Sequence, residues 1–144
     1  MSLRRILIAV DEYPIAAHAA DVGLDLAKCL GAEVAFIHVI DPRGLSAPES
    51  GIPADRAALL AEQEGKRLVA GFRERMPTPA TALEFVQIGQ PVSKIVEAAR
   101  QWPADLIVVG SHGRAGITRT LLGSVAEGIM RHSMCPVLVV RAKQ

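Results

Sequence analysis

Short apolar segments recur along this chain, and the arrangement of their side chains limits the fold more than any other feature. Within each segment the apolar residues are consecutive, many are β-branched, and few polar residues interrupt them. Consecutive apolar residues are typical of strands that are covered on both faces, as in parallel sheets. The segments are Arg5–Asp11, Glu33–Ile40, Leu83–Ile88, Leu106–Val109 and Pro136–Arg141.

Segments with helical periodicity separate these predicted strands. Prolines and glycines mark several of their ends, and Asp41–Pro53 is rich in Pro, Gly and Ser, which predicts a loop. The predicted helices are Pro14–Leu30, Ala54–Met76, a segment that starts at Pro91, and Ser124–His132. Strands that alternate with helices predict an α/β fold, a doubly wound parallel sheet with helices on both faces. The length of 144 residues and the lack of an internal repeat predict a single domain, residues 1–144.

Charge and composition argue against several classes of protein. Lys and Arg number 16 and Asp and Glu 15, so the chain lacks the basic excess of a nucleic-acid-binding protein, and aromatic residues make up only 3%. No apolar stretch reaches the ~20 residues that span a bilayer, and the first residues do not resemble a signal peptide. Cys29 and Cys135 form no CxxC pair and are predicted to be buried small residues, with a reactive thiol at Cys135 as the alternative. We therefore expect a cytoplasmic protein with neither nucleic acid nor membrane as partner.

The segment from Gly110 to Ser124 joins the fourth predicted strand to the last predicted helix and contains four glycines. Glycine lets the backbone turn sharply and lets a ligand approach without a Cβ in the way. Successive backbone N–H groups in such a loop, and those that begin the following helix, favour a phosphate. His112, Arg114 and Arg119 add donors to this segment. Ligands of doubly wound sheets bind at the carboxyl ends of strands, so we expect Asp11 at the same place.

Other nucleotide-binding and catalytic motifs are absent from the sequence. The dinucleotide fingerprint GxGxxG does not occur, and the segment from Gly110 to Ser124 has no lysine, which excludes the Walker phosphate loop. Neither a GxSxG nucleophile elbow nor an HExxH metal pair is present. The histidines are scattered along the chain and do not have the spacing of metal ligands: His18, His38, His112 and His132.

The glycines of this segment carry a resemblance to a known family. Gly110, Gly113, Gly123 and Ser124 spell G-x2-G-x9-G-S, which resembles the nucleotide-binding motif of the ATP-binding branch of the universal stress protein family. The likeness extends to Ile6–Asp11, His38–Val39, Gly123–Glu127 and Cys135–Arg141. The resemblance implies a five-stranded parallel sheet of order 3-2-1-4-5 and a homodimer formed through the last strand, Pro136–Arg141. It also implies ATP as the ligand. Whether Mg²⁺ accompanies the ATP stays open.

The resemblance also implies roles for individual residues. Asp11 matches the acidic residue that faces the nucleotide ribose, and Ala9 and Val39 match positions that line the adenine. Val109 and Gly110 match the strand end beside the ribose and the phosphates. The positions that match the phosphate loop are Gly113, Arg114, Gly123, Ser124 and Val125.

One departure from the family pattern concerns the mouth of the expected site. The family often has a small pair such as Gly-Ser after its first aspartate, whereas this chain has Glu12-Tyr13-Pro14. The helix cap and the entrance to the site can therefore differ from those of the family. Glu12 either repels a triphosphate or helps to hold Mg²⁺.

Each assigned residue also has a simpler structural interpretation. Asp11 can be only a polar strand end, the glycines can serve a tight turn, and Ser124 can be a helix N-cap. Arg114 and Arg119 can be solvated loop charges. A single bound nucleotide would explain all of these residues together.

Three functions fit the sequence, and we expect a nucleotide-binding stress or signalling module. A nucleotide-binding stress or signalling module is favoured over an enzyme, because hydrolysis needs a positioned base or water and charge stabilisation. Only Asp11 and Glu12 are carboxylates expected near the glycine segment. The alternatives are a slow ATPase or adenylyl-transfer enzyme, and an interaction protein that binds no nucleotide. The sequence leaves open the choice among ATP, ADP, AMP and a cyclic nucleotide.

Overall fold

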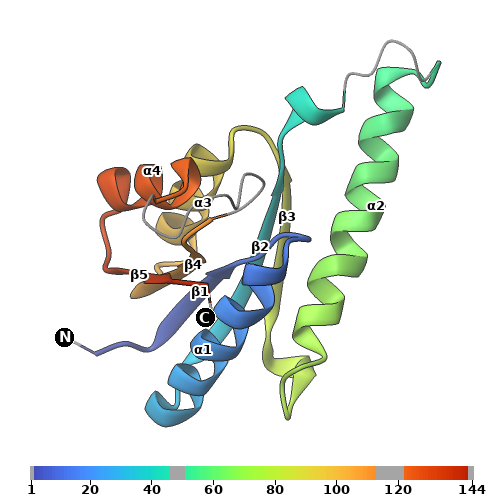
Figure 1. Ribbon diagram of the computed structural model, residues 1–144. Helices are drawn as coiled ribbons and strands as arrows, with labels where there is room; N and C mark the ends of the chain where they lie inside the picture. Colours follow the sequence, from blue (N-terminus) through green and yellow to red (C-terminus); the bar gives the residue numbers. More distant parts are fainter. Residues whose placement is uncertain (1, 46–50, 113–121, 143–144) are drawn as a thin grey trace.

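A computed structural model describes residues 2–45, 51–112 and 122–142. Its strands form one sheet in the order β3-β2-β1-β4-β5, and each neighbouring pair is parallel (Figure 1). The strands are β1 (Arg5–Ala9), β2 (Glu33–Ile40), β3 (Leu83–Ile88), β4 (Leu106–Gly110) and β5 (Val137–Val140). The predicted fold class and strand order are confirmed.

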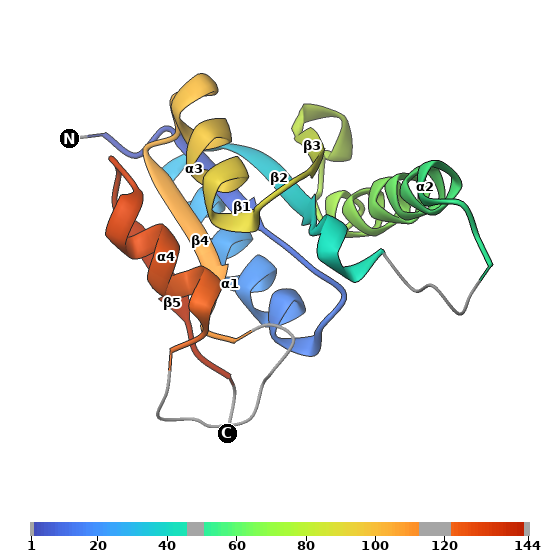
Figure 2. The same cartoon turned by 90° about the horizontal axis from the view of Figure 1, so that it is seen from above.

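The helices lie on both faces of this sheet. α1 and α2 cover one face, and α3 and α4 cover the other (Figures 1 and 2). The helices are α1 (Pro14–Leu30), α2 (Ala54–Arg73), α3 (Pro91–Gln101) and α4 (Ser124–His132), with short 3₁₀ turns at η1 (Pro42–Gly44) and η3 (Pro79–Thr81). None of the described helices is both long and apolar enough to cross a membrane.

Two core layers explain why the strands are apolar throughout. In β1, Ile6 and Ile8 pack in the layer of α1 and α2, whereas Leu7 packs in the layer of α3 and α4. In β2, Phe36 packs in the layer of α1 and α2, and Ile37 packs in the layer of α3 and α4. All five of these side chains are almost completely buried. Burying an aliphatic or aromatic side chain of this size contributes roughly 1.5–3 kcal/mol. A polar substitution on either face would therefore cost stability.

Some elements are shorter than the sequence predicted. β1 ends at Ala9, before the predicted end at Asp11, because the chain turns at Asp11 to enter α1. α2 ends at Arg73, before the predicted end at Met76. The chain then continues in turns closed by i to i+3 hydrogen bonds, in which the Met76 N–H donates to the Arg73 carbonyl (3.0 Å). β5 excludes Pro136, which has no N–H for the ladder, although its carbonyl accepts from the Ile107 N–H (3.0 Å).

Gly128 lies inside α4, where glycine usually costs about 1 kcal/mol relative to alanine. A Cβ at this position would lie 2.6 Å from Cγ2 of Val92, which belongs to α3. Glycine therefore allows α3 and α4 to pack closely against each other on one face of the sheet.

The prediction that both cysteines are buried was wrong. Cys29 is exposed, and Cys135 is partly exposed. Cys29 lies outside the stripe of small residues that α1 buries, which consists of Ala16, Ala19, Ala20, Gly23 and Ala27. The Cys135 Sγ atom lies 3.4 Å from the Ser133 Oγ atom in the turn before β5.

Candidate functional site

A cleft of about 1040 Å³ opens where the carboxyl ends of β1, β2 and β4 meet. β1 and β4 are neighbours in the sheet, and the chain leaves them toward opposite edges. Doubly wound proteins bind ligands at such a switch point. Every predicted site residue within the described ranges lines this cleft: Ala9, Asp11, Val39, Val109, Gly110, Gly123, Ser124 and Val125. Gly113 and Arg114 lie outside the described residues, and their assignment stays a prediction.

Asp11 closes the turn between β1 and α1. Its Oδ1 atom accepts a hydrogen bond from the N–H of Tyr13 (2.9 Å), and Tyr13 is an N-cap whose own side chain caps nothing. Burial is the largest influence on the Asp11 carboxyl and raises its pKa above the ordinary value of 3.8. The charge of Glu12 also raises this pKa, whereas the hydrogen bond from the Tyr13 N–H and the charge of His38 lower it. Asp11 therefore holds the turn in place and also faces the cleft.

His38 is a cleft residue that the sequence analysis did not assign to the site. Its Nδ1 atom lies 2.9 Å from the carbonyl oxygen of Val10. A carbonyl oxygen only accepts, so Nδ1 carries the proton in this hydrogen bond. The bond joins the end of β2 to the residue that follows β1, beside the bond from the Val10 N–H to the Ile37 carbonyl (2.9 Å). A histidine at the carboxyl end of an apolar strand was the available signal.

The N-terminus of α4 forms the wall of the cleft next to β4. Gly123 is its N-cap, with φ −64° and ψ 153°, and donates its N–H to the carbonyl of Ser111 at 2.6 Å. A Cβ on Gly123 would lie 2.7 Å from that same carbonyl oxygen and 3.2 Å from Cα of His112. Close approach of two backbone segments, not a left-handed φ, therefore requires glycine here.

Ser124 is the first residue of α4, so the alternative that it serves as the helix N-cap is wrong. The N–H groups of the first helical turn have no acceptor within the helix. Ser124 and Val125 contribute two of these groups, and both residues line the cleft. With the positive end of the helix dipole, they make this wall suitable for an anion.

Ser111 and His112 follow β4 directly and form a buried polar pair. Ser111 is 3% exposed, and its Oγ atom lies 2.9 Å from Nδ1 of His112. The Nε2 atom of His112 is buried and has no hydrogen-bond partner among the described residues. A buried polar atom without a partner is unfavourable by about 1–3 kcal/mol. Because His112 lines the cleft, a ligand there could supply the missing partner.

The opposite wall of the cleft is formed by α2 and by the turn after β2. Glu64 and Arg67 of α2 are exposed, and Arg43 from the turn pairs with Asp41 (Nη2–Oδ2 2.6 Å). None of these residues was predicted to belong to the site, because helical periodicity does not show which polar residues of a helix face a cleft. This wall presents exposed side chains, unlike the backbone groups of the α4 wall.

The carboxylates of the cleft meet the requirements of Mg²⁺ only in part. Within the described ranges, no group of three His, Cys, Asp or Glu side chains is placed to hold a metal ion. Mg²⁺ in nucleotide sites uses only one or two protein carboxylates, and phosphate oxygens and water complete its shell. Asp11 and Glu12, which line the cleft together, fit that more limited role.

The fold and the cleft define a class of protein, the doubly wound α/β domains with a ligand cleft at the switch point of the sheet. Comparison with known proteins gives the family: the model of the universal stress protein family matches residues 2–141. Universal stress protein MJ0531 of Methanocaldococcus jannaschii is 34% identical over 143 residues, which cover 96% of this chain and 82% of that protein. Universal stress protein YxiE of Bacillus subtilis is 31% identical over 147 residues, which cover 95% and 98%.

A solved structure agrees with these sequence relationships. The hypothetical protein MJ0577 has a TM-score of 0.87 to this chain at 27% identity, and the match covers 100% of this chain and 99% of that one. The chain belongs to the universal stress protein family.

Proposed function

We propose that this protein is an ATP-binding universal stress protein, a cytoplasmic stress-response or signalling module that acts as a homodimer. One observation supports the nucleotide most strongly. Residues assigned from the first strand, such as Asp11, and from the glycine motif, such as Gly123, come from opposite ends of the sequence and line one cleft. The cleft has the volume of a site for a small molecule or cofactor.

The phosphates are proposed to lie at the N-terminus of α4. The N–H groups of Ser124 and Val125, which have no acceptor within the helix, and the helix dipole favour an anion there. His112 would add a donor at Nε2, provided that its Nδ1 accepts from the Ser111 hydroxyl. A phosphate oxygen would then satisfy a buried group that has no partner among the described residues.

The nucleoside is proposed to lie toward β1 and β2. Ala9 and Val39 both belong to the core layer of α3 and α4, and they border the cleft with apolar surface suited to a flat base. Asp11 would accept a hydrogen bond from a ribose hydroxyl. Glu12 lies beside it and would repel a bare triphosphate, so Mg²⁺ is expected to favour binding.

Proteins of the same fold have been solved with adenine nucleotides. One universal stress protein is in complex with cAMP (23% identity, TM-score 0.67), and one from Archaeoglobus fulgidus is in complex with dAMP (22%, 0.66). At these identities the likeness to this chain concerns the fold alone. The choice among ATP, ADP, AMP and a cyclic nucleotide therefore falls to experiment.

Mass analysis of nucleotide released from freshly purified, denatured protein would identify the ligand directly. On nucleotide-free protein, ATP with Mg²⁺ should raise the melting temperature. A ligand that binds only the folded state adds about 2.7 kcal/mol at one hundred times its dissociation constant, which means several degrees for a domain of this size. An unchanged melting temperature at millimolar ATP would contradict the proposal.

Binding is favoured over turnover. The Asp11 carboxyl already accepts the Tyr13 N–H and holds the entry to α1, so it is a poor candidate for a general base. Multiple-turnover release of phosphate or pyrophosphate would instead support a slow ATPase or an adenylyl-transfer enzyme. A protein that neither carries nor binds a nucleotide would support the interaction protein.

The homodimer is proposed to form through Pro136–Arg141. β5 is an edge strand in which Leu138 and Val139 are only partly buried. Met130 and Met134, in and after α4, are 51% and 91% exposed. An edge strand beside exposed apolar side chains favours pairing with a second copy around a two-fold axis. Sedimentation at micromolar concentration should give a dimer, and a clean monomer would contradict this assembly.

A further inference from the structure

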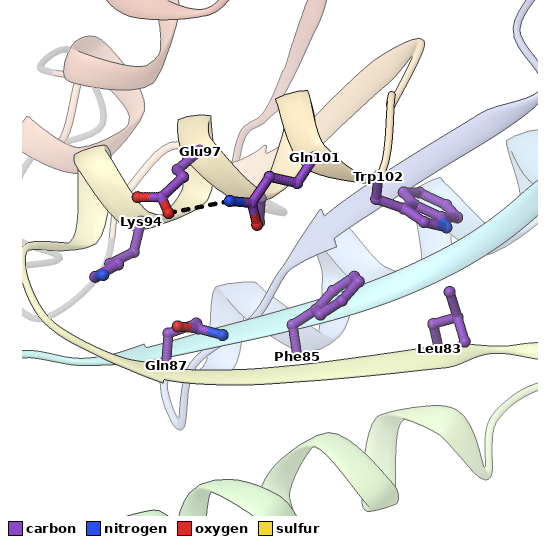
Figure 3. Close-up of a pocket in the computed structure, with 8 residues that line it drawn as sticks. Leu83, Phe85, Gln87, Lys94, Glu97, Gln101 and Trp102 are labelled. Atoms are coloured by element: carbon purple, nitrogen blue, oxygen red, sulfur yellow. Dashed lines mark hydrogen bonds between the residues drawn. The ribbon is translucent and has the colours of Figure 1, made fainter.

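A second hollow of about 300 Å³ lies between β3 and α3, and it shares no lining residue with the cleft. Figure 3 shows its two sides. Leu83, Phe85 and Gln87 come from β3, and the residues that face them come from α3 and its C-cap: Lys94, Glu97, Ala98, Gln101 and Trp102. We call this hollow the α3 slot.

One end of the α3 slot is apolar. The rings of Phe85 and Trp102 meet edge to face, with centroids 6.5 Å apart and an interplanar angle of 64°. Leu83 lies beside them in Figure 3 and is 47% exposed, because β3 is the last strand at this side of the sheet. Small-molecule sites are lined mainly by apolar and aromatic side chains with a few polar groups, and this volume is at the lower end of their range.

The other end of the α3 slot carries a positive charge. Lys94 lies there beside Gln87 in Figure 3, and it has no ion-pair partner among the described residues. It occupies the N-terminal part of α3, where the helix dipole is also positive. A ligand group with negative charge would therefore be stabilised here by both the ammonium group and the dipole.

The position of Lys94 depends on Gly89. A Cβ on Gly89, whose φ is 156°, would lie 2.7 Å from Cε of Lys94, so glycine leaves room for the lysine chain to cross the turn. Glu97 also borders the slot, but it is exposed, and its Oε1 atom accepts a hydrogen bond from Nε2 of Gln101 (3.2 Å). The slot thus has the Lys94 cation at one end, aromatic rings at the other, and the solvent-exposed Glu97 carboxylate, held by Gln101, along its α3 side.

We propose that the α3 slot binds a small amphipathic carboxylate. Its flat apolar body would lie against Phe85 and Trp102, and its carboxylate would pair with Lys94. This site is separate from the nucleotide cleft, so the proposal does not depend on nucleotide binding.

Trp102 makes the proposal directly testable, because it is the only tryptophan in the chain. Intrinsic fluorescence therefore reports on the α3 slot. Titration with 4-phenylbutyrate should change the Trp102 emission with saturation. The uncharged analogue 4-phenylbutan-1-ol has the same ring and chain length, and it should bind about tenfold more weakly because it lacks the charge-assisted hydrogen bond to Lys94.

A matched pair of variants tests the cation. Lys94→Gln should weaken 4-phenylbutyrate about tenfold and leave the alcohol unchanged. Arg100→Gln removes an exposed cation from the same helix outside the slot lining, and it should leave both affinities unchanged. Thermal melts establish that both variants are folded, and saturating ATP should not alter the affinity for 4-phenylbutyrate.

Several results would overturn the proposal. An emission that stays constant up to millimolar 4-phenylbutyrate would show that no such site exists. Equal affinity for the acid and the alcohol, or unchanged binding to Lys94→Gln, would show only an apolar surface, such as one that another protein covers. Competition by ATP would place the probe in the cleft and not in the α3 slot.

Discussion

The two walls of the cleft are built differently. On the α4 wall, backbone meets backbone: the Gly123 N–H lies 2.6 Å from the Ser111 carbonyl oxygen, and a Cβ would have no room. On the α2 wall, Glu64 and Arg67 are exposed side chains, whereas Gly65 between them is buried, and a Cβ there would lie 3.0 Å from Cγ1 of Val86. Substitutions of the exposed side chains should therefore be tolerated on the α2 wall, whereas substitution of Gly123 should be harmful on the α4 wall.

The largest effect is expected from Gly123→Val. Its Cβ would meet the Ser111 carbonyl oxygen at 2.7 Å, which backbone cannot easily avoid. We expect a loss on the order of 1–3 kcal/mol in the free energy of unfolding and a loss of nucleotide affinity of at least ~100-fold, because the first turn of α4 shifts. Denaturant titration and calorimetry measure the two effects.

A control for this variant is Gly71→Ala on α2, outside the cleft lining, where no described atom beyond the neighbouring helix backbone lies within 4 Å of the new Cβ. It should stabilise the protein by roughly 0.5–1 kcal/mol, because alanine is the better helix former, and it should leave ATP affinity unchanged. Equal losses in the two glycine variants would show that the effect of Gly123→Val does not come from its contact with Ser111.

Asp11 gives the next largest effect, and its effect should depend on the part of the ligand tested. Asp11→Ala should weaken binding of adenosine by about tenfold, since its expected partner is a ribose hydroxyl, and should barely change binding of inorganic triphosphate. Calorimetric titrations with the two ligands separate these contributions. A larger change in affinity for triphosphate than for adenosine, in particular a gain, would place the phosphates at β1 instead of α4.

Asp11 should also make stability depend on pH. Burial raises its folded-state pKa above 3.8, so the folded protein binds this proton more tightly than the unfolded chain does. Its contribution to stability is complete below pH 3.8 and is lost as pH rises through the folded-state pKa. Asp11→Asn keeps an acceptor for the Tyr13 N–H but cannot ionise. Denaturant titrations across this pH range should show a smaller decline for the variant than for the parent.

A smaller effect is expected from Ser124→Ala. Because Ser124 is the first helical residue and not the N-cap, its loss should hardly change stability. Nucleotide affinity should fall by about fivefold, corresponding to ~1 kcal/mol for one hydrogen bond to a phosphate. A loss of stability as large as that of affinity would mean that the hydroxyl caps α4 after all.

The smallest effect is expected on the α2 wall. Arg67 is exposed, and an exposed charge contributes roughly 0–1 kcal/mol and is screened by salt. Arg67→Ala should therefore weaken ATP by no more than about threefold at low salt, and the difference should vanish at ~0.5 M salt. A salt-independent loss of tenfold or more would show that both walls bind the ligand closely.

Much of the fold could be predicted from local patterns. Consecutive apolar residues in Ile6–Val10 require cover on both faces, and alternation with helices then restricts the sheet to the parallel, doubly wound type. The resemblance supplied the strand order. The glycine motif and Asp11 pointed to the cleft because the carboxyl ends of parallel strands lie at the same edge of the sheet.

The remainder depends on contacts between distant residues, which local patterns do not contain. The hydrogen bond from His38 to the Val10 carbonyl requires β1 and β2 to lie side by side. Lys94 and the aromatic rings line one slot only because α3 packs over β3. Gly123 was recognised from its motif, but the reason for glycine, the approach of Ser111, needed the structure. Cys29 was misplaced because its burial was predicted from residue type, whereas its position around α1 lies outside the buried stripe.

Ser111 joins the α4 wall to the very last strand. Its carbonyl accepts from the Gly123 N–H, while its own N–H donates to the Val140 carbonyl at 2.8 Å. A nascent chain that has emerged only as far as α4 therefore contains the cleft residues but lacks the acceptor that holds Ser111. During synthesis, we therefore expect Ser111 to gain this acceptor only when β5 has left the ribosome and paired with β4, so the α4 wall would reach its final geometry late.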